Sequence, residues 1–407
     1  MKRRERKKLE ALNKAREIAG HLVRDLNIAA KGFAGAIVEY SQEDVPNWEL
    51  SFRAKTVGRA FFALVDGVSF ALRAAVIEWA PEVERELTPE DKRQLQEKKG
   101  PAERIAGLEL AFQQFSSLFG ISFPFVLEGE GGQAFLGLEK TMNEIDHPKV
   151  LADLFGQGIF TCFLPASAWF LARLSQLFQV CNQAIEESDL KVEEYDLPAL
   201  AVIGDKRLVF TDEDLAGVRD TPFAEMKYAK AGFLGLMEDS SRALEQSLEF
   251  ARIDTIIGPH GQFGQKNLLR TLFAETDGHI AIAKLVLAAA ADFSAEDAEN
   301  FDERLEEDER LVRVLNLFSR KFDRQKQVLT GSKNWQNFRK AQAILQRMAN
   351  PRSVADLKLS NEAISALDGA QDWFRSVIGL LYVDEEPKTA AAEEEAANPD
   401  EAAAAAE

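Results

Sequence analysis

The chain has 407 residues, of which 46% are hydrophobic and 29% charged, and its formal net charge is −18. This composition is typical of a soluble globular protein and excludes a collagen-like or wholly low-complexity chain, while the length favours two domains. The acidic balance argues against a basic nucleic-acid groove, and two cysteines are too few for a disulfide framework.

Residues 2–8 form a basic run that opens a long helix. We interpret this run as the solvated start of the helix; a contact with nucleic acid or with an acidic partner is the alternative. No apolar stretch of the kind found in signal peptides follows it. The longest apolar stretch, residues 159–172, is too short to span a bilayer and is expected to be a buried helix. We therefore expect a cytoplasmic protein without a membrane anchor.

Helical patterns continue along most of the chain. Residues 57–79 are apolar on more than one face, as expected of a central helix with neighbours all round, and residues 102–119 carry an apolar stripe at spacings of three and four. Strand signals are confined to residues 199–210, where two apolar runs flank Gly204 and Asp205. The expected fold is therefore all-α, with a possible short β-hairpin in the linker.

One string of the sequence occurs twice. Residues 147–154 read HPKVLADL and residues 350–357 read NPRSVADL, so that a histidine in the first copy is an asparagine in the second. The match continues on both sides, at similar offsets, in the pairs Phe135 and Phe338, Trp169-Phe170 and Trp373-Phe374, Arg104 and Arg310, Phe112 and Phe318, and residues 87–91 and 293–297. Two long copies predict tandem domains rather than a solenoid.

Further upstream, residues 60–72 pair with residues 232–244, at an offset of 172, which implies a 34-residue insertion in the second copy. The expected organisation is a first helical domain with its basic leading helix (1–185) and an acidic linker (186–222). A second domain (223–383) follows, with the insertion at about 245–292. The chain ends in an acidic, Ala/Glu-rich tail (384–407), whose composition predicts disorder.

The repeated string and the helix before it resemble the HEPN superfamily of helical-bundle proteins. The signature of that family is an arginine, four to six residues, and a histidine, often with a polar residue after the arginine. The resemblance implies two bundles that pair with both motifs facing one cleft, here as an intrachain pseudo-dimer or as a homodimer. Many members are metal-independent ribonucleases of toxin and phage-defence systems.

The chemistry behind that motif needs two residue types. A histidine moves protons near neutral pH, and an arginine neutralises charge on phosphoryl oxygens. In this chain His147 and the polar residue Asn143 are present, but the arginine position is Met142. In the second copy the corresponding positions are Leu345 and Asn350.

A composite site is the alternative: Arg347 lies three residues before Asn350, and in this hypothesis it faces the same cleft as His147 and Asn143. These four residues are the candidate catalytic set of an altered ribonuclease. The preferred hypothesis is a non-catalytic binding or regulatory protein, whose partner is another protein or an RNA or nucleotide. We expect no cofactor and no metal.

Overall fold

A computed structural model describes residues 3–40, 47–97, 103–148, 153–154, 156–186, 244, 246–256, 261–289, 307–322 and 330–379. Every regular element in these ranges is a helix, which confirms the all-α prediction. The possible hairpin at residues 199–210 and nearly all of the expected linker lie outside the described residues, as does the C-terminal tail.

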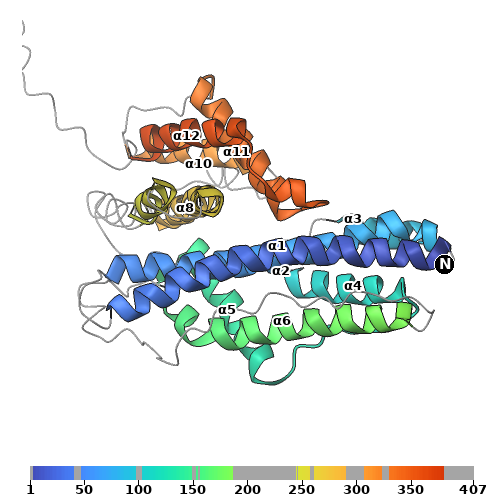
Figure 1. Ribbon diagram of the computed structural model, residues 1–407. Coiled ribbons are helices and arrows are strands. Elements are labelled where there is room, and N and C mark those ends of the chain that lie inside the picture. Colours follow the sequence, from blue (N-terminus) through green and yellow to red (C-terminus); the bar gives the residue numbers. More distant parts are fainter. Residues whose placement is uncertain are drawn as a thin grey trace, which may run out of the picture.

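The first half of the structure contains two long helices and five further elements packed on them. Helix α1 (Arg3–Tyr40) runs along α2 (Asn47–Trp79), and the short helices η1 (Pro81–Val83) and α3 (Pro89–Gln96) follow at the end of that pair. Helices α4 (Arg104–Ser117), α5 (Gly129–Asp146) and α6 (Gln157–Glu186) cover the other side of α2 (Figure 1). As its all-round apolar pattern predicted, α2 is central.

The second half lies on the opposite side of the α1–α2 layer (Figure 1). It contains the helical residues 246–256, α8 (Gly261–Ala289), α10 (Glu307–Lys321) and α11 (Lys333–Ala349). The turn η5 (Val354–Leu357), α12 (Asn361–Phe374) and η6 (Arg375–Gly379) complete it. Helix α8 lies between α2 and the α10–α12 group, and it contacts α2, α5, α10, α11 and α12.

The two copies of the repeated segment pack their aromatic residues alike. In the first half, the rings of Phe135 on α5 and Trp169 on α6 lie 5.6 Å apart. In the second half, the rings of Phe338 on α11 and Trp373 on α12 lie 4.6 Å apart. The sequence repeat therefore corresponds to two helix pairs, α5–α6 and α11–α12, that are held together by equivalent ring contacts.

The two halves also exchange side chains between their cores. Phe52 and Leu154 of the first half belong to the hydrophobic core of the second. Phe263 and Leu357 of the second half belong to the core of the first. Contacts between helices follow the same pattern, since α5 contacts α8 while α11 contacts α2. Side chains therefore cross between the two halves in both directions.

Two helices are long and apolar enough to cross a membrane by length and composition alone. In the segment Glu49–Trp79, 72% of the most apolar stretch is buried, as expected of the core helix of a folded domain. In Gln157–Ile185 only 33% is buried. The expectation of a buried helix at residues 159–172 is therefore only partly met, because α6 has an outer side that the rest of the described structure does not cover.

Removing the ring of Phe52 should test how much the exchanged side chains stabilise the protein. Phe52 is 0% exposed, so Phe52→Ala should lower the free energy of unfolding by about 3–5 kcal/mol, as measured by chemical denaturation. The control is Ile256→Ala, at a side chain that is 71% exposed, which should change it by no more than about 0.5 kcal/mol. Equal, small effects of both substitutions would show that Phe52 is not part of a packed core.

Candidate functional site

The two motif helices end in the same backbone conformation. His147 caps α5 with φ −131° and ψ 64°, and its N–H donates to the Asn143 carbonyl at 2.9 Å. Asn350 caps α11 with φ −122° and ψ 61°, and its N–H donates to the Gln346 carbonyl at 3.1 Å. A proline follows each cap and prevents the helix from continuing. The repeated string is thus a repeated helix end.

The position that the resemblance assigns to arginine faces the protein core in the first half. Met142 is 5% exposed and packs over Gly58 on α2, where any larger residue would meet the methionine sulfur. Asn143 and His147, one turn apart, are both exposed. The last turn of α5 therefore presents an imidazole and an amide to solvent without a cation from the family position.

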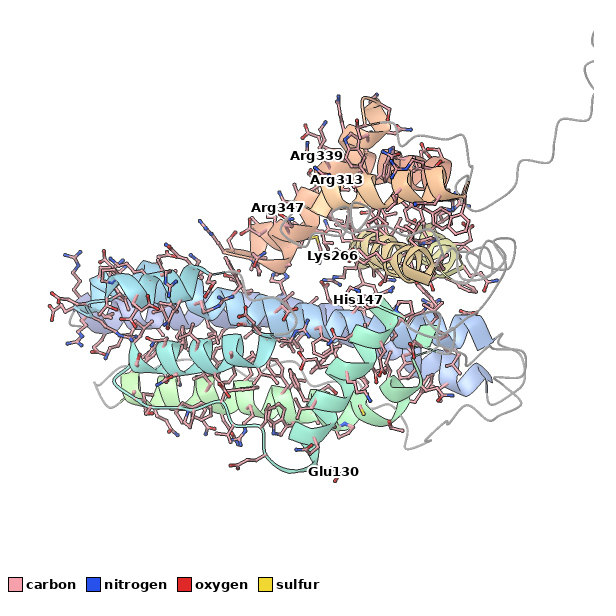
Figure 2. The ribbon with its side chains drawn as sticks, turned by 180° about the vertical axis from the view of Figure 1, so that it is seen from behind. Glu130, His147, Lys266, Arg313, Arg339 and Arg347 are labelled. Carbon is pink, nitrogen blue, oxygen red and sulfur yellow. The ribbon has the colours of Figure 1, made fainter. Side chains whose placement is uncertain are left out.

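Polar side chains at the end of the second motif helix, α11, form hydrogen bonds within their own half. The Asn350 side-chain amide donates to the Gln346 carbonyl at 2.9 Å, and Arg347 donates to the Lys358 carbonyl at 3.3 Å. In Figure 2, His147 lies at the end of α5 beside α8, whereas Arg347 lies on α11 in the other half. No hydrogen bond or ion pair within the described ranges joins His147 or Asn143 to Arg347 or Asn350. The composite site stays a prediction.

A group of buried charged side chains lies at the contact between the two halves, and it includes Asp146, the residue directly before His147. Arg59 on α2 donates to Glu275 on α8 at 3.1 Å and to the Thr271 hydroxyl at 3.5 Å. Lys55, one turn earlier on α2, donates to Ser247 at 2.6 Å. Asp146, the last residue of α5, interacts electrostatically with both cations.

Burial shifts the pKa of Lys55, Asp146 and Glu275. It lowers the pKa of Lys55 to about 8. The nearby carboxylates of Glu275 and Asp146 raise this pKa, but by less than burial lowers it. Burial also raises the pKa of Asp146 and that of Glu275. Three buried atoms of this group, Arg59 Nε, Asp146 Oδ1 and Glu275 Oε2, have no hydrogen-bond partner among the described residues. The group therefore carries charge that its own contacts do not fully satisfy.

A second buried group lies further along the same interface. Lys266 on α8 contacts both carboxylate oxygens of Asp25 on α1, at 2.9 and 3.1 Å, and Arg270 lies 3.8 Å from the same carboxylate. Between the two groups, the Asn267 side chain donates to the Thr56 hydroxyl at 3.4 Å. Polar side chains of α2 and α8 thus face each other along the contact between the halves.

These interface residues were missed in the sequence, although a signal for them exists. At an offset of 211, α8 repeats α2 with seven identities, namely Phe52/Phe263, Lys55/Lys266, Arg59/Arg270, Phe62/Phe273, Ala63/Ala274, Asp66/Asp277 and Gly67/Gly278. Their surroundings also correspond, because Leu22 packs over Gly67 as Leu244 packs over Gly278.

This match offers a second pairing for the expected insertion at residues 245–292, which stays a prediction. Helix α8 lies inside that range and packs in the hydrophobic core of the second half. The offset of 211 is also close to the offsets of 203 to 206 found downstream, so no long insertion is needed. Residues 232–243, on which the pairing at an offset of 172 depended, lie outside the described residues.

The cations of the basic leading helix form ion pairs within the first half. Arg3 pairs with Glu82 at 3.3 Å and Lys14 with Glu78 at 2.6 Å, while Arg6 and Lys7 both pair with Glu10. These ion pairs favour the interpretation as a solvated helix start. In the part of the chain that is described, no group of three or more histidine, cysteine or acidic residues is placed to hold a metal ion.

Comparison with protein-family models, with curated proteins and with solved structures found no match to this chain.

The buried lysine should make stability depend on pH in a defined interval. The pKa of Lys55 is about 8 in the folded protein and 10.5 in an ordinary lysine, so the unfolded chain binds more protons between these values. The contribution of Lys55 to the free energy of unfolding should therefore rise from pH 8 to pH 10.5, by up to about 3 kcal/mol.

Denaturant unfolding at several pH values would measure this rise in the wild type and in Lys55→Met. The rise should be lost in the variant and kept in Lys14→Met, whose lysine lies near the surface. An identical pH profile for Lys55→Met and the wild type would contradict burial of this amine.

Proposed function

We propose that the protein is a non-catalytic, HEPN-like binding or regulatory protein, built as an intrachain pseudo-dimer of two related helical bundles. What supports the pseudo-dimer is the reciprocity of the interface. Phe52 and Phe263 are equivalent at an offset of 211, and each lies in the core of the other half. Thr56 and Asn267, equivalent at the same offset, contact each other, as residues on a two-fold axis do.

The axis also relates the two charged groups. If Leu22 corresponds to Leu244, then Asp25 corresponds to Ser247 at the same offset of 222. The contact of Lys266 with Asp25 is then the counterpart of the contact of Lys55 with Ser247. A fused homodimer whose halves later diverged would have this pattern, with one buried carboxylate replaced by a hydroxyl.

The observation that carries the non-catalytic assignment is the burial of Met142. A methionine packed on Gly58 cannot stabilise charge on a phosphoryl group, and absence of a preorganised donor typically costs about 3 kcal/mol or more of transition-state stabilisation. In the second copy the corresponding residue is Leu345, which is partly buried. Neither motif therefore supplies a cation from the position where the family has one.

The second candidate function is a metal-independent ribonuclease with an altered site. It is favoured by the joint exposure of Asn143 and His147 on the last turn of α5, with Arg347 and Asn350 of the second copy as the remaining members of the set. In either case the resemblance suggests a cytoplasmic protein of a toxin–antitoxin or phage-defence system, with an RNA, a nucleotide or another protein as partner.

A cleavage assay separates the two functions. Labelled single-stranded RNA incubated with the purified protein in EDTA should stay intact, because the last turn of α5 has a proton-transfer group but no charge-stabilising partner. The rate should equal that of a blank without protein, and it should be the same for His147→Ala.

Wild-type cleavage that His147→Ala abolishes would overturn the non-catalytic assignment. Arg347→Ala then tests the composite site, because a loss of cleavage in this variant too would place both halves in one active site. Arg93→Ala, which removes an exposed arginine of α3 in the first half, is the matched control.

A further inference from the structure

Helix α11 is basic in a chain that is acidic overall. Its 17 residues include four cations and no acidic residue, and two more cations follow within and just after the turn that connects it to α12. We call these six exposed side chains the α11 basic face: Lys333, Arg339, Lys340, Arg347, Arg352 and Lys358. Asp356 lies nearby, but its carboxylate accepts hydrogen bonds from the N–H groups of Arg352 and Ser353 and from the Ser353 hydroxyl.

Three members of the face form a regular stripe. Lys333, Lys340 and Arg347 follow each other at intervals of seven residues, or about 10 Å along a helix, on the side opposite the buried Trp335 and Phe338. Figure 2 shows Arg339 and Arg347 along one side of the second half. The stripe is therefore an extended row of positive charge about 20 Å long.

Most of these cations are not neutralised. Lys333, Lys340, Arg347, Arg352 and Lys358 make no ion pair with any carboxylate that the structure describes. The cations of α1 differ, since Arg3, Arg6 and Lys14 each pair with a glutamate. A row of like charges without counter-charges repels itself and attracts a polyanion.

The equivalent helix of the first half is an internal comparison. Helix α5 has four acidic residues and one lysine, so its net charge is −3, against +4 for α11. Both helices make the same aromatic contacts and end in the same conformation, so this place in the fold does not itself require positive charge. The basic face of α11 is therefore a property of the second copy alone.

The chain contains a segment with the complementary charge. Residues 384–407 have nine acidic residues and one lysine, a net charge of −8 against +6 for the α11 basic face. The segment begins five residues after Gly379, where η6 ends, and η6 continues from α12, which packs on α11. Its 24 residues can extend by roughly 80 Å, several times the length of the stripe. A short tether also gives an effective concentration on the order of millimolar.

We propose that the α11 basic face is a docking surface whose occupant is the acidic C-terminal segment, residues 384–407, of the same chain. An external polyanion that binds this face would compete with the segment. This inference does not depend on the pseudo-dimer or on the non-catalytic assignment, because it uses only the charges of α11 and of the C-terminal segment.

Photo-cross-linking in the full chain tests the proposal. A benzophenone amino acid at Ala404 should cross-link, within one molecule, to peptides from residues 333–358. The triple variant Lys333→Glu, Lys340→Glu, Arg347→Glu should lower the yield at least about tenfold, since three ion pairs of about 0.5 kcal/mol each are replaced by repulsion. Saturating heparin, a polyanion, should lower the yield of the wild type as well.

The matched control reverses three exposed arginines elsewhere, Arg3→Glu, Arg6→Glu and Arg93→Glu, with the same change in net charge. This control should cross-link as the wild type does. The uncharged variant Lys333→Gln, Lys340→Gln, Arg347→Gln should also lose cross-linking, which excludes misfolding caused by the added carboxylates.

Cross-links outside residues 333–358, or equal yields in the face and control variants, would overturn the proposal. So would labelled single-stranded RNA that binds the α11 basic face without reducing cross-linking of the segment. That result would make a nucleic acid, rather than the C-terminal segment, the occupant of this face.

Discussion

The packing of α2 against α8 is the contact on which the arrangement of the whole molecule depends. Each helix is central to its own half, and each sends a phenylalanine, Phe52 or Phe263, into the core of the other. Removing either helix would therefore open both cores at once. The same two helices position the ends of α5 and α11, because α5 contacts α8 and α11 contacts α2. The site residues depend on this contact as much as the cores do.

The polar part of this contact is costly. Arg59 pairs with Glu275 between two hydrophobic cores, and burial there opposes the charge of Glu275, Lys55 and Asp146. Well-packed apolar residues would often stabilise such an interface more. Buried charges can instead fix the orientation of the two halves. Each cation has few partners, and a shift of α2 along α8 would leave it unpaired. We infer that the charged groups fix how the halves meet, while Phe52, Leu154, Phe263 and Leu357 supply the apolar burial.

The helical fold and the repeated helix pair could be predicted from the sequence, because an apolar pattern at helical spacing and a string such as HPKVLADL carry strong local information. The relation of α2 to α8 was missed for a physical reason. Apolar strings such as residues 60–64 recur easily in any helical protein. Their match to residues 232–236 rests on the apolar composition that both segments share. The polar matches Lys55/Lys266 and Arg59/Arg270 were the informative ones, since a buried cation is rare and needs a particular partner. The burial of Met142 also depends on tertiary contacts with α2 that no local pattern reveals.

Disulfide trapping at the contact of Thr56 with Asn267 tests the central claim most directly, because these equivalent residues would lie on the axis between the halves. Thr56→Cys with Asn267→Cys, in a chain with Cys162 and Cys181 changed to serine and alanine, should form a disulfide within one molecule when it is folded under oxidising conditions. Thr56→Cys with Ile256→Cys, a position on the exposed side of residues 246–256, should stay reduced. A Thr56–Asn267 pair that stays reduced, or that links only separate molecules, would contradict the packing of α2 against α8 and the pseudo-dimer built on it.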